Sequence, residues 1–164
     1  MYDISECIGN GDAETLRIIL NEANRTVADQ FGLTPENAPT NPAFCATEAV
    51  VGQMERGNRF FLLRDGSNAP SGCVAIEKNP RDGGVYYIER LAVLPERRHR
   101  GYGRNLLDRA VLEIRRAGAR AAGIGIIDEN RILKDWYLQY GFEVTGMKKF
   151  EHLPFTVCFL SLSL

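Results

Sequence analysis

The chain has 164 residues, of which 45% are hydrophobic and 25% are charged, with a formal net charge of -1. This length and composition fit one globular domain with a sizeable core, and they exclude a low-complexity or repeat protein. No apolar run approaches the ~18 residues needed to cross a bilayer, so we expect no membrane partner. The first residues are acidic where a secretory signal would be basic and then apolar, which predicts a cytoplasmic protein.

Hydrophobic spacing and turn residues predict elements in the order α, α, β, β, β, α, β, α, β, β. Helices are expected at about 12–27, 43–56, 106–118 and 129–140. Strands are expected at about 59–65, 71–79, 85–94, 121–127, 142–146 and 155–164. Asp12 is the candidate N-cap of the first helix. This order predicts an α/β (α+β) fold in which helices cover the faces of a mixed sheet.

The distributions of cysteine and charge narrow the class of ligand. The four cysteines lie far apart and the chain has only two histidines, so we expect no metal site. Residues 1–57 carry a formal charge of -6, whereas residues 58–164 carry +5. The basic part suits an anionic ligand and the acidic part a cationic one, although charges that merely solvate the surface are the simpler explanation.

A basic loop with two glycines, PERRHRGYGRNLL at 95–107, leads from a predicted strand into a predicted helix. At such a junction, backbone N–H groups and the positive end of the helix dipole face a bound phosphate. Gly101 and Gly103 allow the main chain to approach a ligand closely, and the four arginines of the loop add positive charge. The loop therefore predicts an anion-binding site.

Three phosphate-binding templates fit this loop poorly. The P-loop pattern needs a lysine and a hydroxyl residue that are both missing, and the dinucleotide fingerprint fails at its third glycine, where Leu106 stands. Nucleic acid is disfavoured because the basic residues are confined to one loop without stacking aromatics, in a chain of pI about 6.1. We therefore expect no nucleic-acid partner and keep an NAD(P)-dependent redox enzyme as a secondary alternative.

Two segments together resemble the GNAT superfamily of acyl-CoA N-acyltransferases. The family pattern Q/R-x-x-G-x-G/A after an L-x-V strand end is matched by Arg98, Gly101 and Gly103 after Leu91 and Val93. Downstream, the family has an Asn that begins a helix, a Tyr near the end of that helix, and a Gly-Phe pair. Their counterparts here are Asn130, Tyr137 and the YGF at 140–142. The resemblance covers residues 58–164, while residues 1–57 match only in outline, as two helices after a short or degenerate strand.

The resemblance implies acetyl-CoA as the co-substrate. The loop would bind its pyrophosphate through main-chain amides, with support from the arginine side chains at 98, 100 and 104. The strand end at 91–93 would receive the pantetheine arm and hold the thioester carbonyl with free N–H groups. Asn130 would contact the cofactor while also capping a helix. The expected cofactor-binding residues are Leu91, Ala92, Val93, Arg98, His99, Arg100, Gly101, Tyr102, Gly103, Arg104 and Asn130.

Acetyl transfer to an amine needs one base and one acid. The resemblance implies that Tyr137 protonates the departing thiolate; by itself it would be taken for a core aromatic. Glu89 is the candidate base, acting directly or through water, with an arginine salt bridge as the equally weighted alternative. Because Glu89 alternates with Leu91 and Val93, we expect all three on one sheet face, where Tyr87 would shape the acceptor pocket.

The predicted function is transfer of an acetyl group from acetyl-CoA to a primary amine by direct attack, because no cysteine is placed to form an acyl-enzyme. The resemblance implies a mostly antiparallel sheet and one N-acetyltransferase domain over 1–164. Within it, residues 1–57 would form the helical acceptor side and 58–164 the acetyl-CoA-binding core. The acidic first part favours a small cationic amine. Its candidate carboxylates are Glu22, Asp29, Glu36 and Glu48.

Other functions stay open at this point. The acceptor could be an amine of a protein or peptide. The chain could also be a non-catalytic acyl-CoA-binding sensor or interaction module, against which the presence of Tyr137 argues. The alternating final strand at 155–164 could join two copies in a homodimer.

Overall fold

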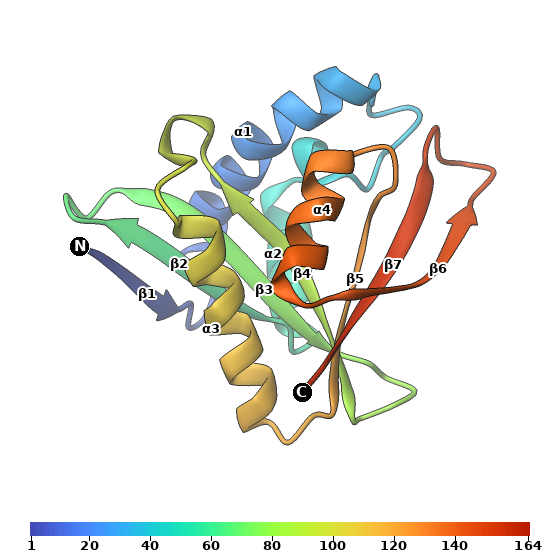
Figure 1. Ribbon diagram of the computed structural model, residues 1–164. Coiled ribbons are helices and arrows are strands. Elements are labelled where there is room, and N and C mark those ends of the chain that lie inside the picture. The colour runs from blue at the N-terminus through green and yellow to red at the C-terminus, as the bar shows by residue number, and fades with distance from the viewer.

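The computed structural model describes all residues from 1 to 164 (Figure 1). They form seven strands and four α-helices. The strands are β1 (Tyr2–Glu6), β2 (Arg59–Asp65), β3 (Pro70–Lys78), β4 (Val85–Val93), β5 (Ala121–Ile127), β6 (Glu143–Lys149) and β7 (Thr156–Ser163). The helices are α1 (Ala13–Phe31), α2 (Thr47–Glu55), α3 (Tyr102–Arg116) and α4 (Arg131–Tyr140). None of them combines the length and the apolar character that a membrane-spanning helix requires.

The strands form one mixed sheet in the order β1-β2-β3-β4-β5-β7-β6. Every neighbouring pair is antiparallel except β4 and β5. Figure 1 shows α3 and α4 in front of this sheet and α1 and α2 behind it. The expected α/β fold, with a mostly antiparallel sheet and helices on both faces, is therefore confirmed.

Alternation of side chains divides the core between the two faces of the sheet. Phe61 and Val74 belong to the cluster that packs against α3 and α4. Their neighbours Phe60 and Cys73 belong to the cluster beneath α1 and α2. Because β2 and β3 are covered on both faces, they consist of nearly continuous buried residues.

The sheet is split where β4 and β5 run parallel. These strands pair only over Val85–Tyr87 and Ala121–Gly123. Beyond Tyr87 each strand keeps its partner on the other side, since β4 continues along β3 and β5 along β7. The edges of β4 and β5 that face each other therefore have unpaired backbone groups beyond that point.

A β-bulge in β4 adds to this divergence. Cys73 and Ala75 of β3 pair with Ala92 and Glu89, so two residues of β4 stand opposite one residue of β3. Arg90 takes the left-handed conformation that this needs, with φ of 56°. The Cys73 thiol donates a hydrogen bond to the Arg90 carbonyl at 3.5 Å, which satisfies an acceptor that the ladder leaves free.

The elements lie close to their predicted positions, with three differences. The spacing analysis missed β1, because its sequence YDISE has only one strongly apolar residue and pairs with β2 through the backbone. Helix α2 begins at Thr47, because Pro42–Phe44 form a separate 3-10 turn. Asp12 occupies the N-cap of α1 without a side-chain cap bond, and its carboxylate instead lies 3.6 Å from the Arg64 guanidinium.

The final strand does not have the free edge that pairing across a dimer would need. β7 lies between β5 and β6 and is paired with both. The edges of the sheet are β1 and β6. The last two strands cross over, so residues 155–164 cannot join two copies through a free β7 edge, and a homodimer stays a prediction.

Candidate functional site

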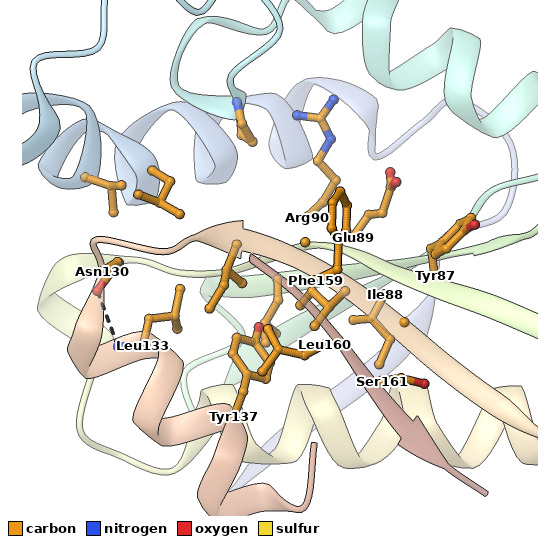
Figure 2. A pocket seen from close by; sticks show the side chains of 18 of the residues that line it. Tyr87, Ile88, Glu89, Arg90, Asn130, Leu133, Tyr137, Phe159, Leu160 and Ser161 are labelled. Carbon is orange, nitrogen blue, oxygen red and sulfur yellow. Dashed lines mark hydrogen bonds between the residues drawn. The ribbon is translucent and has the colours of Figure 1, made fainter. Parts of the chain in front are cut away.

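A cavity of about 850 Å³ occupies the split between β4 and β5. Its walls come from both strands, from α1 and the segment that follows it, from the start of α4, and from β6 and β7. Figure 2 shows that the apolar side chains Ile88, Leu133 and Leu160 lie on the same side as Tyr137. The side chains of Glu89 and Arg90 extend to the opposite side, toward α1 and α2.

The end of β4 contributes unevenly to the cavity. Leu91 lines it, whereas Ala92 is buried against the core beneath α1 and Val93 packs on the core beneath α3. All three belong to the part of β4 that has no β5 partner. Backbone groups on that open edge are available to a ligand that lies along it as an added strand.

The loop before α3 has the backbone geometry of an anion site. His99 and Gly101 both have positive φ, 61° and 80°, and Gly101 is the N-cap of α3. The first intrahelical acceptor used is the Gly101 carbonyl, which binds the N–H of Asn105. The N–H groups of residues 102–104 therefore have no acceptor inside the helix, and they lie at the positive end of the helix dipole. Such adjacent amides form a concave site for phosphate oxygens.

The side chain of Arg98 is bound by the protein itself. Its guanidinium donates to the Ala23 carbonyl at 2.7 Å, to the Thr26 hydroxyl at 3.3 Å and to the Val93 carbonyl at 3.3 Å. These bonds join α1 to the end of β4 and occupy most of the guanidinium donors, so support of a pyrophosphate by this side chain stays a prediction. Its main-chain N–H is also used, in a 3.3 Å bond to the Pro95 carbonyl.

Two further arginines of the loop are engaged with neighbouring carboxylates. Arg97 forms a 2.7 Å salt bridge with the buried Asp65, which fixes the start of the loop against the turn after β2. Arg104 contacts Asp108 at 3.2 Å and lies over the ring of Tyr140. Arg100 is exposed and belongs to none of the salt bridges, so its guanidinium is the freest of the four.

Tyr137 lies on the inner side of α4 and is only 2% exposed. Its ring packs edge-on against Trp136 and Phe142, with centroids 4.9 and 5.4 Å away. Figure 2 shows the hydroxyl directed into the cavity with no hydrogen bond to the other residues drawn. Burial raises the pKa of this hydroxyl above its usual value, so it stays protonated at neutral pH. The cavity wall therefore contains a buried phenol that keeps its proton.

Glu89 lies on a different sheet face from the one that alternation predicted. Leu91 and Val93 pack on the α3 side, while Glu89 pairs with Ala75 of the core beneath α1. The bulge at Arg90 is the physical reason, because one extra residue reverses the alternation beyond it. Tyr87 and Glu89 both line the cavity, as expected, and the Tyr87 hydroxyl accepts a hydrogen bond from Asn79 at 2.8 Å.

The surroundings of Glu89 favour its protonated form. Burial raises the pKa of this carboxyl, and the carboxylate of Glu77 on the adjacent strand raises it further. Arg90 and Arg56 act in the opposite direction with less effect. Glu89 makes no salt bridge, so the arginine-paired alternative is not what the structure contains. A carboxyl with a raised pKa is suited to accept and release protons.

Asn130 combines a structural position with access to the cavity. Its side-chain oxygen accepts the N–H of Leu133 at 3.3 Å, which makes it the N-cap of α4 (Figure 2). It also lines the cavity. Capping uses the oxygen, so the side-chain NH₂ is left for a ligand.

The acceptor side of the cavity differs from expectation. The four carboxylates expected to hold a cationic amine, Glu22, Asp29, Glu36 and Glu48, are all exposed and none lines the cavity. Asn24 and Asn41 lie there instead, together with Arg90. Sequence reasoning missed Arg90 and Glu77, because regular alternation places Arg90 on the opposite face and cross-strand neighbours cannot be identified before the register is known.

The sequence and the fold of this chain were compared with those of known proteins. The model of the acetyltransferase (GNAT) family matches residues 22–142. A search of curated proteins found no significant match.

Solved structures share the whole fold. A protein from Desulfovibrio desulfuricans, assigned to the GNAT family as an acetyltransferase, superposes with a TM-score of 0.79 at 21% identity and covers 99% of both chains. YncA of Salmonella typhimurium, assigned as an acetyltransferase and solved with its cofactor acetyl-CoA, gives 0.73 at 20% identity, covering 100% of this chain and 94% of its own. The ribosomal-protein-S18-alanine N-acetyltransferase of Escherichia coli gives 0.77 at 14% identity, covering 99% and 94%.

Proposed function

The chain belongs to the acetyltransferase (GNAT) family and is thus an acyltransferase, and from that premise we propose that it transfers the acetyl group of acetyl-CoA to a primary amine by direct attack in a ternary complex. One observation carries the proposal: the Glu89 carboxyl and the Tyr137 hydroxyl line one cavity from opposite sides, at the place where β4 and β5 separate. An acid and a base on the two sides of a cleft are what the reaction requires.

Acetyl-CoA is proposed to lie in the split of the sheet. Its pyrophosphate would bind the free amides that follow Gly101, with the exposed Arg100 as an additional cation. Its pantetheine arm would pair with the open edge of β4 at 91–93, near Asn130. The N–H groups on that edge would hold the thioester carbonyl and stabilise the oxyanion as it forms. YncA, which has the same fold, was solved with acetyl-CoA, and this supports acetyl-CoA as the co-substrate.

Glu89 takes one proton from the ammonium group of the acceptor, directly or through a water molecule, and later releases it to solvent. The resulting amine forms a bond to the acetyl carbon, and the carbon–sulfur bond breaks as the oxyanion collapses. The nitrogen then loses a second proton to water, which restores the proton that Tyr137 gives up. Tyr137 gives its proton to the departing thiolate, for which its position at the apolar end of the cavity is suited.

The acceptor is proposed to be a small molecule with a primary amine. Glu89 lies in the wall of a cavity of about 850 Å³, a volume that can enclose a compact acceptor. We propose that residues 1–57, which supply the α1 wall, form the acceptor side and that residues 58–164, which supply the strands and the loop, form the acetyl-CoA-binding core. A strongly cationic acceptor loses its support, because the acidic residues of α1 and α2 lie outside the cavity.

The test is release of free thiol from acetyl-CoA in the presence of a mixed pool of amines. We expect turnover by the native enzyme and a loss of about 10²-fold or more in kcat for Tyr137→Phe, which removes the proposed acid. Acetyl-CoA affinity measured by calorimetry should change little, because the aromatic packing of the ring is kept. Trp136→Phe, a change in the adjacent aromatic outside the cavity, is the matched control.

Two results would contradict the proposal. Acetyl-CoA binding without turnover of any amine would indicate a non-catalytic binding module. Turnover that Tyr137→Phe leaves unchanged would remove Tyr137 from the mechanism.

A further inference from the structure

Arg90 has an unusual position in the cavity wall. It is one of three residues other than glycine with positive φ, at 56°, and lies at the bulge where β4 separates from β5. A residue with a side chain is strained in this conformation. Strain of this kind is maintained by the surrounding structure and concentrates at functional sites. Here the 3.5 Å bond from the Cys73 thiol to the Arg90 carbonyl helps to hold it.

The bulge brings the side chains of two adjacent residues to the same side of the sheet. In a regular strand, Glu89 and Arg90 would point to opposite faces. Figure 2 shows both reaching toward α1 and α2, and both line the cavity. A carboxyl and a guanidinium therefore stand together on the acceptor side.

The Arg90 guanidinium has no counter-charge in its immediate contacts. None of the salt bridges in the protein includes it, although its side chain is partly buried. Among the residues that line the cavity, Glu89 is the single carboxyl and Arg90 the single cationic group. Helix α1 and the segment that follows it contribute the amides Asn24 and Asn41 to the lining. The charge of Arg90 acts on Glu89 without a salt bridge between the two, so the guanidinium fork is left for a ligand that brings an anion.

We infer that the acceptor carries a carboxylate next to its amino group, and that Arg90 binds this carboxylate while the amino group meets Glu89. The inference rests on the proposed acetyl transfer. The guanidinium fork matches the two oxygens of a carboxylate, and the side chains of Glu89 and Arg90 extend from neighbouring residues to the same side of the sheet (Figure 2). α-Amino acids and their analogues, whose amine and carboxylate are separated by one carbon, are the class that fits. A peptide N-terminus lacks the adjacent carboxylate.

The experiment compares α-amino acids with matched amines in which hydrogen replaces the carboxylate, using acetyl-CoA and the thiol assay. The native enzyme should prefer the carboxylate-bearing partner by about tenfold or more in kcat/KM, as a charge-assisted hydrogen bond predicts. Arg90→Gln should reduce that preference to less than about threefold, and Arg90→Lys should keep part of it. Arg90→Gly suits the left-handed backbone and provides a second variant that folds without strain.

Arg56→Gln is the matched control. Arg56 also acts on the charge of Glu89 but is exposed and does not line the cavity, so this variant should keep the carboxylate preference. Equal losses on both acceptors in Arg90→Gln would overturn the inference, because they would show that Arg90 only balances the charge of Glu89. Equal turnover of both acceptors by the native enzyme would overturn the inference alone. Turnover of neither, with acetyl-CoA bound, would overturn the proposed function as well.

Discussion

At the scale of single residues, the pKa of Glu89 in the cavity wall depends on a second glutamate on the neighbouring strand β3. Glu77 pairs with Tyr87, and Ala75 pairs with Glu89, so the two glutamates are diagonal neighbours on one sheet face. Like charges at such positions disfavour joint ionisation. Together with burial, this raises the pKa of Glu89 and links its protonation to a residue outside the cavity wall.

The pH dependence of acetyl transfer should report this coupling. If Glu89 must be ionised to act as the base, kcat/KM rises with pH through the pKa of Glu89, which lies above 4.5. Glu77→Gln removes a nearby negative charge, lowers that pKa and should move the acidic limb of the profile to lower pH. Arg56→Gln removes a positive charge and should move it the other way.

Both variants are compared with the native enzyme on the same acceptor, so that ionisation of the acceptor cancels. Identical acidic limbs in all three proteins would show that Glu89 is not the titrating base. A shift of Glu77→Gln to higher pH would contradict the like-charge interaction.

At the scale of elements, structural contacts and the proposed anion binding fall to different groups of the loop before α3. Arg97 and Arg98 are structural, since they fasten the loop to Asp65 and to α1. The proposed anion site would consist of backbone amides, whose direction depends on the left-handed turn at Gly101. Gly103 is less restricted, because an added Cβ there would meet its nearest neighbours at 3.8 Å, an ordinary contact distance.

Gly101→Val should weaken acetyl-CoA binding by about tenfold or more, because a β-branched residue disfavours positive φ and would turn the amides away from the phosphates. Calorimetry of acetyl-CoA binding measures this. Gly118→Val is the matched control: Gly118 has φ of 77° just beyond the other end of α3 and lies away from the loop. It should cost similar stability, about 1–2 kcal/mol, with no effect on affinity. Equal affinities in both variants would count against the amide site.

At the scale of the whole molecule, a cluster of charges fastens α3 to the first two strands. Glu113 of α3 is 6% exposed and contacts Arg59 at 2.9 Å, Arg116 at 3.0 Å and Arg109 at 3.1 Å. Arg59 also binds Glu6 of β1 at 2.7 Å. This network lies on the half of the sheet away from the split, where it joins α3 to β1 and β2.

Glu113 should make folding stability sensitive to acid. Burial acts to raise the pKa of Glu113, but the bonds and charges of Arg59, Arg109 and Arg116 outweigh it and hold the pKa below its usual value of 4.5. Its contribution is therefore present above pH 4.5 and is lost as pH falls through the lower folded-state pKa. Glu113→Gln should lower the free energy of unfolding by about 1–3 kcal/mol at pH 7 and flatten its dependence on pH in that range.

Urea unfolding of both proteins across pH 3–7 provides the measurement. Asp108→Asn, which removes an exposed carboxylate from the same helix, should have a much smaller effect. A pH dependence that is equally steep in Glu113→Gln and in the native protein would contradict this role.

The sequence by itself determined the order of elements from α1 onward and indicated the family. Hydrophobic spacing placed β2 and β5 at their observed residues, and the two short motifs around Arg98 and Asn130 predicted a fold that the structure confirms. These features are local, because periodicity and turn chemistry are properties of consecutive residues. The assignments of acetyl-CoA contacts and of Tyr137 and Glu89 to catalysis stay predictions.

Only the tertiary structure decided which residues meet. The direction of Glu89 and Arg90 depends on a bulge whose extra residue is counted against β3, a strand that is distant in sequence. Arg98 is occupied because α1 brings the Ala23 carbonyl to the loop, 75 positions away in the chain. The acidic residues of α1 and α2 lie outside the cavity because helix rotation is set by packing of the apolar side. Strand register, helix rotation and the order of β6 and β7 in the sheet depend on contacts between residues far apart in the chain. Composition and local spacing do not predict such contacts.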